Sequence, residues 1–232
     1  MVNQMYRTIP HKYLFLAAGW LVLGTYLAIG SLNQLAAGTV FRPMQAVTIA
    51  WVILSFFLHK PVWRWFWKKW PSLGRWIYPD LNGLWEVEIA SNISIHRQIA
   101  DTVAGRSAPF DIVTCDDAKL APLESVRLQA EIDQSWFKIE ISFFDSTNRL
   151  PIKGSEIVTV DPKRAEGLKA AMLNYIFRQT NAKVAQGDER VFEGAAMLDY
   201  DIASDELRGF FWTNRMWHRA QNTAGTIVYR RV

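Results

Sequence analysis

Acidic residues are missing from the first 79 positions of the chain, although this region carries eight Lys and Arg. No charged residue occurs between positions 13 and 41, and residues 13–32 alone are long enough to cross a bilayer as a helix. A second apolar run, residues 43–58, is shorter and spans only if its ends reach into the interface. Every later apolar run is too short to span as a helix. The pattern predicts an integral membrane protein with an N-terminal transmembrane helical hairpin.

Cysteine is almost absent as well, since Cys115 is the only one. A single cysteine excludes a disulfide framework, which agrees with a cytoplasmic location for the rest of the chain. The four histidines are scattered without metal-ligand spacing, and neither a phosphate-binding glycine loop nor a nucleophile elbow occurs. Adjacent carboxylates such as Asp116 and Asp117 are typical of a solvated loop. We therefore expect no enzymatic activity, no metal and no cofactor.

A cleaved signal peptide is the alternative interpretation of the first apolar run. The run is longer than the usual apolar core of a signal peptide, and a second run follows closely, which favours a hairpin. Basic residues flank the hairpin on both sides, whereas Arg42 alone lies between the runs. Because basic residues collect on the cytoplasmic side, we expect both termini inside the cell and a short outer loop around residues 33–42.

Aromatic residues are concentrated in residues 61–76, which contain five tryptophans. One helical face carries Trp63, Phe66, Trp67 and Trp70, and the basic residues lie off that face. This arrangement is typical of a short helix in the headgroup layer. The alternative is that the second span continues to Trp67 and the tryptophans form its aromatic belt. Nucleic-acid binding is less favoured, because a membrane surface accounts for the same composition.

The rest of the chain alternates between apolar and polar side chains, as half-buried antiparallel strands do. It holds 18 Lys and Arg against 22 Asp and Glu, so the positive charge of the whole chain belongs to the membrane segment. We divide the chain into a hairpin (1–60), an interfacial helix or linker (61–79) and a β domain (80–232). Eight strands are expected, at residues 85–89, 126–133, 137–143, 152–160, 169–179, 191–200, 206–214 and 223–232. Helical spacing within residues 162–177 leaves a helix there as an alternative.

Eight consecutive antiparallel strands close naturally into a small up-and-down β-barrel. The connections after the odd strands are long, and in a meander they share one end of the barrel, whereas the membrane linker enters at the other end. A ligand would therefore bind at the mouth away from the bilayer. Polar residues at that end are the candidate site, and ordinary solvated strand ends are the alternative explanation for them. The candidates are Arg215, Thr213, Tyr175, Ser155 and Arg178.

Gln134 has the same inward parity but lies at the opposite end of the barrel, where we expect it to satisfy the turn. It belongs to a series of segments whose order resembles a known family. The series is Asn82-Gly83-Leu84-Trp85, the segment 132–139, Ser155, Leu173-Asn174-Tyr175-Ile176-Phe177, the segment 207–215 and Gly225-Thr226-Ile227. Preceded by two apolar runs, it resembles the SMODS-associated, two-transmembrane, β-strand-rich effectors, which are membrane effectors of cyclic-oligonucleotide antiphage signalling (CBASS). The aromatic segment 61–76 and the long connection 92–122 depart from that pattern.

The resemblance implies that a cytoplasmic barrel binds a cyclic dinucleotide, that binding promotes homo-oligomerisation, and that the spans then disrupt the inner membrane. The partners would be this ligand, the lipid bilayer and further copies of the chain, and not DNA or RNA. Tyr175 would stack on a base, Arg215 and Arg178 would pair with phosphates, and Thr213 and Ser155 would add hydrogen bonds.

Two alternatives stay open at the level of the sequence. A membrane-tethered, lipocalin-like binder of an apolar ligand requires a barrel interior without cations. A structural protein that recruits partners requires a barrel filled with side chains.

Overall fold

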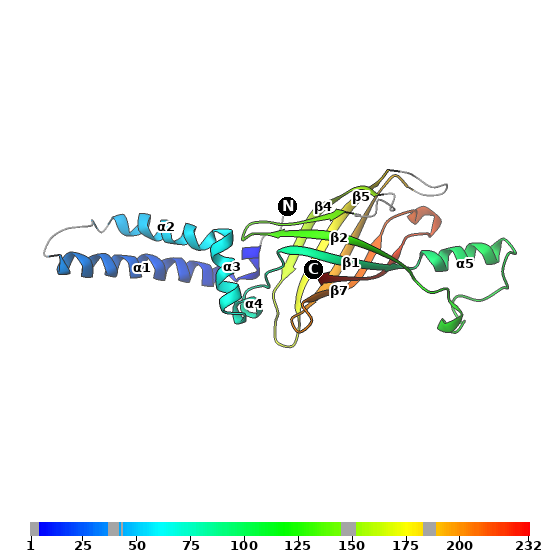
Figure 1. The fold of residues 1–232 in the computed structure, drawn as a ribbon, viewed down its shortest axis with the longest axis horizontal. Helices are drawn as coiled ribbons and strands as arrows, with labels where there is room; N and C mark the ends of the chain where they lie inside the picture. Colours follow the sequence, from blue (N-terminus) through cyan, green and yellow to red (C-terminus); the bar gives the residue numbers. More distant parts are fainter. Residues whose placement is uncertain (1–4, 37–41, 43, 145–151, 183–188) are drawn as a thin grey trace.

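Residues 5–36, 42, 44–144, 152–182 and 189–232 are described by the computed structural model of the chain. Figure 1 shows a pair of helices that projects from one end of a curved sheet. A short 3₁₀ turn, η1 (Met5–Thr8), leads into α1 (His11–Leu35), and α2 (Gln45–Leu58) runs back beside α1. Two short helices, α3 (Lys60–Lys69) and α4 (Ser72–Trp76), lie between this hairpin and the sheet.

The two hairpin helices differ in their ability to cross a membrane. α1 alone is long and apolar enough, because its 25 residues extend about 37 Å against a hydrocarbon core of about 30 Å. α2 has 14 residues, extends about 21 Å, and meets the same criterion only together with α3. The α2–α3 pair is bent by 69°. The described residues thus contain one candidate span, α1, with α2 as its antiparallel companion, and the second span stays a prediction.

The bend between α2 and α3 has a local cause. His59 has extended backbone angles and ends α2, and Pro61 lies in the first turn of α3. Proline is tolerated there because its missing N–H would have no partner within the helix. α3 is therefore a separate helix, and not a continuation of α2.

Eight antiparallel strands form the sheet, which curves into a nearly closed barrel. The strands are β1 (Gly83–Ser91), β2 (Glu124–Gln134), β3 (Ile139–Phe144), β4 (Ile152–Lys163), β5 (Ala171–Asn181), β6 (Val191–Asp201), β7 (Glu206–Thr213) and β8 (Ala224–Arg231). Their spatial order is β3-β2-β1-β8-β7-β6-β5-β4. β3 and β4 lie side by side, but no hydrogen-bonded ladder joins their described residues. The up-and-down barrel expected from the sequence is confirmed, with a seam between β3 and β4.

Two details of the strand assignment are settled by the structure. The stretch 162–177 belongs to the end of β4, a connection and the start of β5, so the strand interpretation is confirmed and the helix is wrong. Phe137, which we assigned to the third strand, instead lies in the turn between β2 and β3 and is half exposed. That turn is closed by the Ser135 N–H, which donates to the Lys138 carbonyl at 2.7 Å.

The barrel end nearest the hairpin is sealed by buried side chains and hydrogen bonds. Gln134 is completely buried, and its Oε1 accepts from the Leu81 N–H at 2.7 Å while its Nε2 donates to the Pro79 carbonyl at 3.1 Å. Its own N–H donates to Asn82 Oδ1 at 2.8 Å. Gln134 thus satisfies backbone groups here, as expected, and joins the end of β2 to the segment that enters β1.

Arg231 at the end of β8 completes this seal. Its guanidinium donates to the carbonyls of Asn82 and Asp80 at 2.7 and 2.8 Å and pairs with Asp205 at 2.6 Å. The same group lies 4.3 Å from the centre of the buried Trp85 ring. The last strand is therefore tied to the first residues of the barrel.

The helical segment docks on the sealed end through α3 and η1, which contact Trp136 in the β2–β3 turn. Trp67 of α3 contacts Trp136 edge-on at 5.7 Å, and its Nε1 donates to the Tyr78 carbonyl at 2.7 Å. Trp63 also contacts Trp136, and the Tyr6 N–H of η1 donates to the Trp136 carbonyl. Trp63 and Trp67 are buried in this contact, so the four-residue aromatic face expected to meet the headgroups is divided between the barrel and the outside.

We predict that Gln134→Ala lowers the free energy of unfolding, because it leaves the Leu81 N–H and the Pro79 carbonyl buried without this partner. Each such group costs about 1–3 kcal/mol, and each kcal/mol shifts the melting temperature of a domain of this size by about 2–4 °C. Thermal unfolding of the full chain in detergent, followed by circular dichroism, measures the change. Gln129→Ala on the outward side of the same strand is the control, and equal melting temperatures for the two variants would contradict the assignment.

Candidate ligand-binding site

Long connections gather at the barrel end opposite the hairpin, as the alternation of loop lengths predicts. The β1–β2 connection contains α5 (Ile93–Val103) and the 3₁₀ turn η2 (Asp117–Lys119), and the β7–β8 connection contains η3 (Trp217–Arg219). Figure 1 shows α5 on the far side of the barrel from α1 and α2. Asn92 joins the start of α5 to the start of β8. The Asn92 N–H donates to the Ala224 carbonyl, and Asn92 Oδ1 accepts from the Ala224 N–H, both at 3.0 Å.

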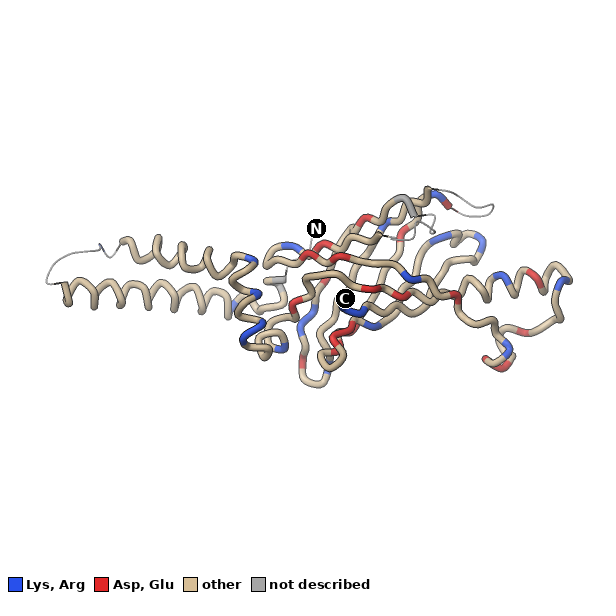
Figure 2. The backbone as a smooth tube through the Cα atoms, in the orientation of Figure 1, with Lys and Arg blue, Asp and Glu red and all other residues tan. Residues whose placement is uncertain are grey.

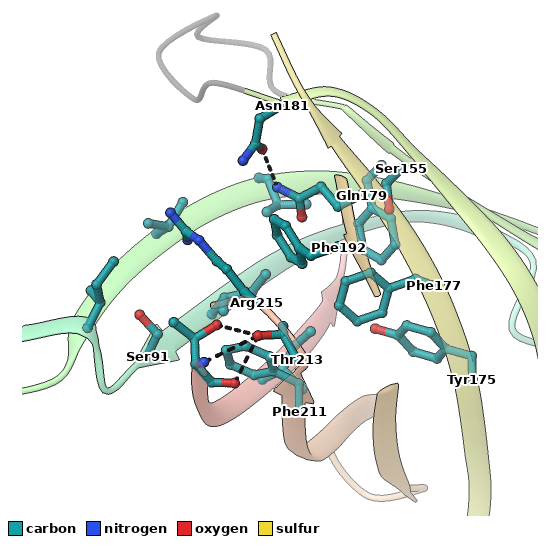
Figure 3. A pocket seen from close by; sticks show the side chains of 17 residues that line it. Ser91, Ser155, Tyr175, Phe177, Gln179, Asn181, Phe192, Phe211, Thr213 and Arg215 are labelled. Atoms are coloured by element: carbon teal, nitrogen blue, oxygen red, sulfur yellow. Dashed lines mark hydrogen bonds between the residues drawn. The ribbon is translucent and has the colours of Figure 1, made fainter. Parts of the chain in front are cut away.

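A cavity of about 200 Å³ lies inside the barrel at this end (Figure 3). All eight strands contribute to its wall, each with the part of the strand that is remote from the hairpin. Its apolar wall includes five aromatic rings, from Phe143, Tyr175, Phe177, Phe192 and Phe211. One end of the barrel is thus sealed, whereas the other holds a hollow lined with aromatic side chains.

Tyr175 forms the inner limit of the cavity. Its hydroxyl lies 2.6 Å from that of Tyr229, and burial raises the pKa of both groups above the usual range for tyrosine. Both hydroxyls therefore stay protonated and uncharged at physiological pH. The ring of Tyr175 lies 6.1 Å from the ring of Phe177 on the same strand. The ring of Tyr175 thus forms part of the cavity wall, while its hydroxyl is hydrogen-bonded to Tyr229 inside the barrel.

Phe177 owes its place to a glycine on the neighbouring strand. Gly194 faces Phe177 across β5 and β6, and a Cβ atom there would come within 2.4 Å of the Phe177 ring. A larger residue at position 194 would push this ring into the cavity. The absence of a side chain on β6 therefore preserves the hollow.

Arg215 lies just beyond β7, at the mouth of the cavity. Figure 3 shows its side chain extending across the hollow, and its guanidinium carbon lies 5.5 Å from the centre of the Phe192 ring. The next residue, Met216, is buried and has left-handed backbone angles (φ 50°), which a residue with a side chain adopts only at a cost. The chain thus turns sharply after Arg215, and the arginine stays over the mouth.

Thr213 and Thr223 clamp the strands beneath Arg215. Their hydroxyls are 2.8 Å apart, and the Thr213 N–H donates to the Thr223 carbonyl at 2.9 Å. Both residues are buried and both line the cavity. Thr213 is therefore where the sequence predicted it, but its hydroxyl already bonds Thr223 and holds the strand that carries Arg215.

Three further polar side chains line the cavity from β4 and β5. Ser155 does so as expected, and Gln179 and Asn181 were missed by the sequence analysis. Gln179 Nε2 donates to Asn181 Oδ1 at 3.1 Å, and Asn181 Nδ2 donates to the Glu189 carbonyl at 3.2 Å. Their signal was present, because Gln179 and Asn181 share the period-two parity of Tyr175.

Arg178 points to the other face of the same strand. It is exposed and donates two hydrogen bonds to Glu193 Oε1, at 2.7 and 3.1 Å. Residues three apart on a strand face opposite sides, so Arg178 cannot share the cavity with Tyr175. The structure places four of the five predicted residues on the cavity and leaves Arg178 outside it.

The cavity has a positive character despite the net negative charge of the barrel. Of the described residues that line it, Arg215 alone is charged. Glu88 of β1 and Glu193 of β6 are paired with arginines on the outer face. An anion at the mouth would therefore meet the guanidinium of Arg215.

Comparison with known proteins agrees with part of the sequence analysis. No protein-family model matches the chain. CD-NTase-associated protein 15 of Escherichia albertii is 28% identical to it over 176 residues, which cover 75% of this chain and 73% of the relative. The name of this relative describes that protein as associated with a CD-NTase. The two-transmembrane effector subfamily suggested by the sequence stays a prediction.

We predict that Tyr175→Phe and Tyr229→Phe are not additive in their effects on stability. Either substitution alone leaves a buried hydroxyl without its partner, at a cost of about 1–3 kcal/mol, whereas the double variant removes both hydroxyls. The double variant should therefore be more stable than the sum of the two single losses implies. Thermal unfolding of the three variants measures the coupling, and additive losses would show that the two hydroxyls do not depend on each other.

Proposed function

We propose that this protein is a membrane-anchored effector of CBASS antiphage signalling, whose barrel binds a cyclic dinucleotide and performs no catalysis. The observation that carries the proposal is the cavity, in which aromatic rings surround a hollow and a single arginine lies over the mouth. The similarity to CD-NTase-associated protein 15 supports the biological setting.

The cavity suits the two chemical parts of a nucleotide. Its volume of about 200 Å³ is below the 300–1,000 Å³ usual for a pocket that holds a whole ligand. One base therefore enters the hollow and stacks against its aromatic wall, which includes Tyr175 and Phe177, and such stacking contributes about 1–3 kcal/mol. The ribose–phosphate ring stays at the mouth, within reach of Arg215, and Ser155 and Gln179 offer hydrogen bonds to the base or sugar.

The two alternatives are less well supported by the same geometry. A barrel that only recruits partners would be filled with side chains, whereas this barrel contains a hollow. A lipocalin-like carrier of an apolar ligand fits the aromatic wall, but it requires an interior without cations, whereas Arg215 lines this cavity. A cation that projects over an apolar pocket favours a ligand that is partly aromatic and partly anionic.

The hairpin supplies the membrane anchor in this proposal. Both of its connected ends face the barrel, so a hairpin that crosses the bilayer leaves the N-terminus and the barrel on one side, the cytoplasm. α2 is shorter than the hydrocarbon core, and a short span is accommodated by local thinning of the bilayer or by association with other copies. If the ligand causes many copies to cluster, the regions of thinned bilayer around their short spans would merge, and the inner membrane would be disrupted.

We predict that Arg215→Ala weakens cyclic-dinucleotide binding by about ten- to a hundredfold without unfolding the barrel, because a charge-assisted contact to phosphate contributes about 1.5–3 kcal/mol. Isothermal titration of the full chain in detergent with a panel of cyclic dinucleotides measures the loss, and thermal melts check the fold.

Arg178→Ala is the matched control for that variant, since it removes the same charge from the outer face of the barrel. Its affinity should equal that of the unmodified chain. Unchanged affinity for Arg215→Ala, or equal losses for both variants, would remove Arg215 from the ligand site.

We also predict that both termini are cytoplasmic. A reporter fused at residue 232 should be active only in its cytoplasmic form, and one inserted within residues 33–40 only in its periplasmic form, because basic residues flank the hairpin. A periplasmic C-terminus would be incompatible with a signal made inside the cell.

A further inference from the structure

A second hollow lies at the opposite end of the barrel, between the short helices and the rim. We call it the junction cleft and define it by Arg64, Trp65 and Lys68 of α3, Arg75 of α4, and Tyr200 and Arg231 of the barrel. The sealed end of the barrel separates it from the aromatic cavity that holds Arg215 at its mouth. The proposed ligand of the barrel does not account for it.

The cleft carries an excess of positive charge. Two of its four cations are matched by carboxylates, since Arg64 pairs with Asp80 at 2.8 Å and Arg231 pairs with Asp205 at 2.6 Å. The other two, Lys68 and Arg75, have no acidic partner among the residues that the structure describes. An anion in the cleft would thus meet two cations that are not already neutralised.

The wall of the cleft also has an apolar side. Trp65 is 54% exposed, and the nearly buried Trp67 contributes an aromatic surface between α3 and the barrel. Adjacent Trp rings and basic side chains are typical of groups that lie at the level of lipid headgroups. A solvated anion such as free phosphate has no need of this apolar surface.

The position of the cleft in the molecule also agrees with a location at the level of the lipid headgroups. Figure 2 shows Lys and Arg gathered where the hairpin meets the barrel, while α1 and α2 are uncharged along most of their length. α3 turns away from α2 by 69° at this point, so it runs across the base of the hairpin and does not extend it. When the hairpin lies in a bilayer, the junction cleft lies at the surface of the cytoplasmic leaflet.

We propose that the junction cleft binds the headgroup of an anionic phospholipid, with Lys68 and Arg75 on its phosphate and Trp65 against the glycerol and upper acyl region. This inference rests on the membrane placement proposed for the hairpin and does not depend on the ligand of the barrel. A bound headgroup contacts α3 and α4 on one side and the rim of the barrel on the other. It therefore holds the barrel against the membrane surface.

The full chain is placed in nanodiscs of equal parts phosphatidylglycerol and phosphatidylcholine. The protein is then released from the nanodiscs, and native mass spectrometry identifies the lipid that it retains. The unmodified chain should retain phosphatidylglycerol in preference. The double variant Lys68→Gln/Arg75→Gln should reduce that preference by about tenfold, since it removes the two unmatched charges. Lys12→Gln at the start of α1 is the control, because Lys12 lies at the same end of the hairpin but does not line the cleft.

Three results would overturn the inference. Equal retention of the two lipids by the unmodified chain would show that there is no selective site, although the chain resides in the bilayer. An equal loss for Lys12→Gln would show that surface potential alone attracts the lipid. Displacement of phosphatidylglycerol by millimolar inorganic phosphate would make the site one for a soluble anion. Failure of the chain to enter nanodiscs would instead refute the membrane placement itself, on which this inference depends.

Discussion

Gln134 joins segments that would otherwise meet only through packing, at the end of the barrel nearest the membrane helices. Its amide bonds both Leu81 and Pro79, while its N–H is held by Asn82, so the end of β2 and the entrance of β1 form one buried unit. Arg231 attaches the last strand to the same residues. Buried polar groups stabilise only when they are satisfied, and here they are satisfied by chain segments about 50 and 150 residues apart in sequence.

This sealed end makes the barrel asymmetric, and the proposed function depends on that asymmetry. The helical segment docks against Trp136 on one side of the seal, and the aromatic cavity opens on the other. Among the described residues, the seam between β3 and β4 is the part of the wall without a ladder, and the Trp136 turn leads directly into β3.

Much of the fold could be predicted because it depends on local periodicity. Alternation with a period of two identified all eight strands and the meander that joins them, and Gln134 was assigned correctly to the turn end of the barrel. Phe137 was misassigned because the alternation continues through a turn. Arg178 was grouped with Tyr175 by its position along the strand, whereas its parity places it outside, beside Glu193.

The sequence by itself determined that an apolar, acid-free segment precedes an antiparallel β domain, since both patterns reflect the solvent that each side chain meets. Only the tertiary structure decided how the tryptophans of α3 are used, because Trp63 and Trp67 find their partner about 70 residues later at Trp136. It also decided which polar residues share a hollow. Ser155 and Gln179 come from two strands and Arg215 from the connection after a third, and only the closure of the barrel brings their side chains to one cavity.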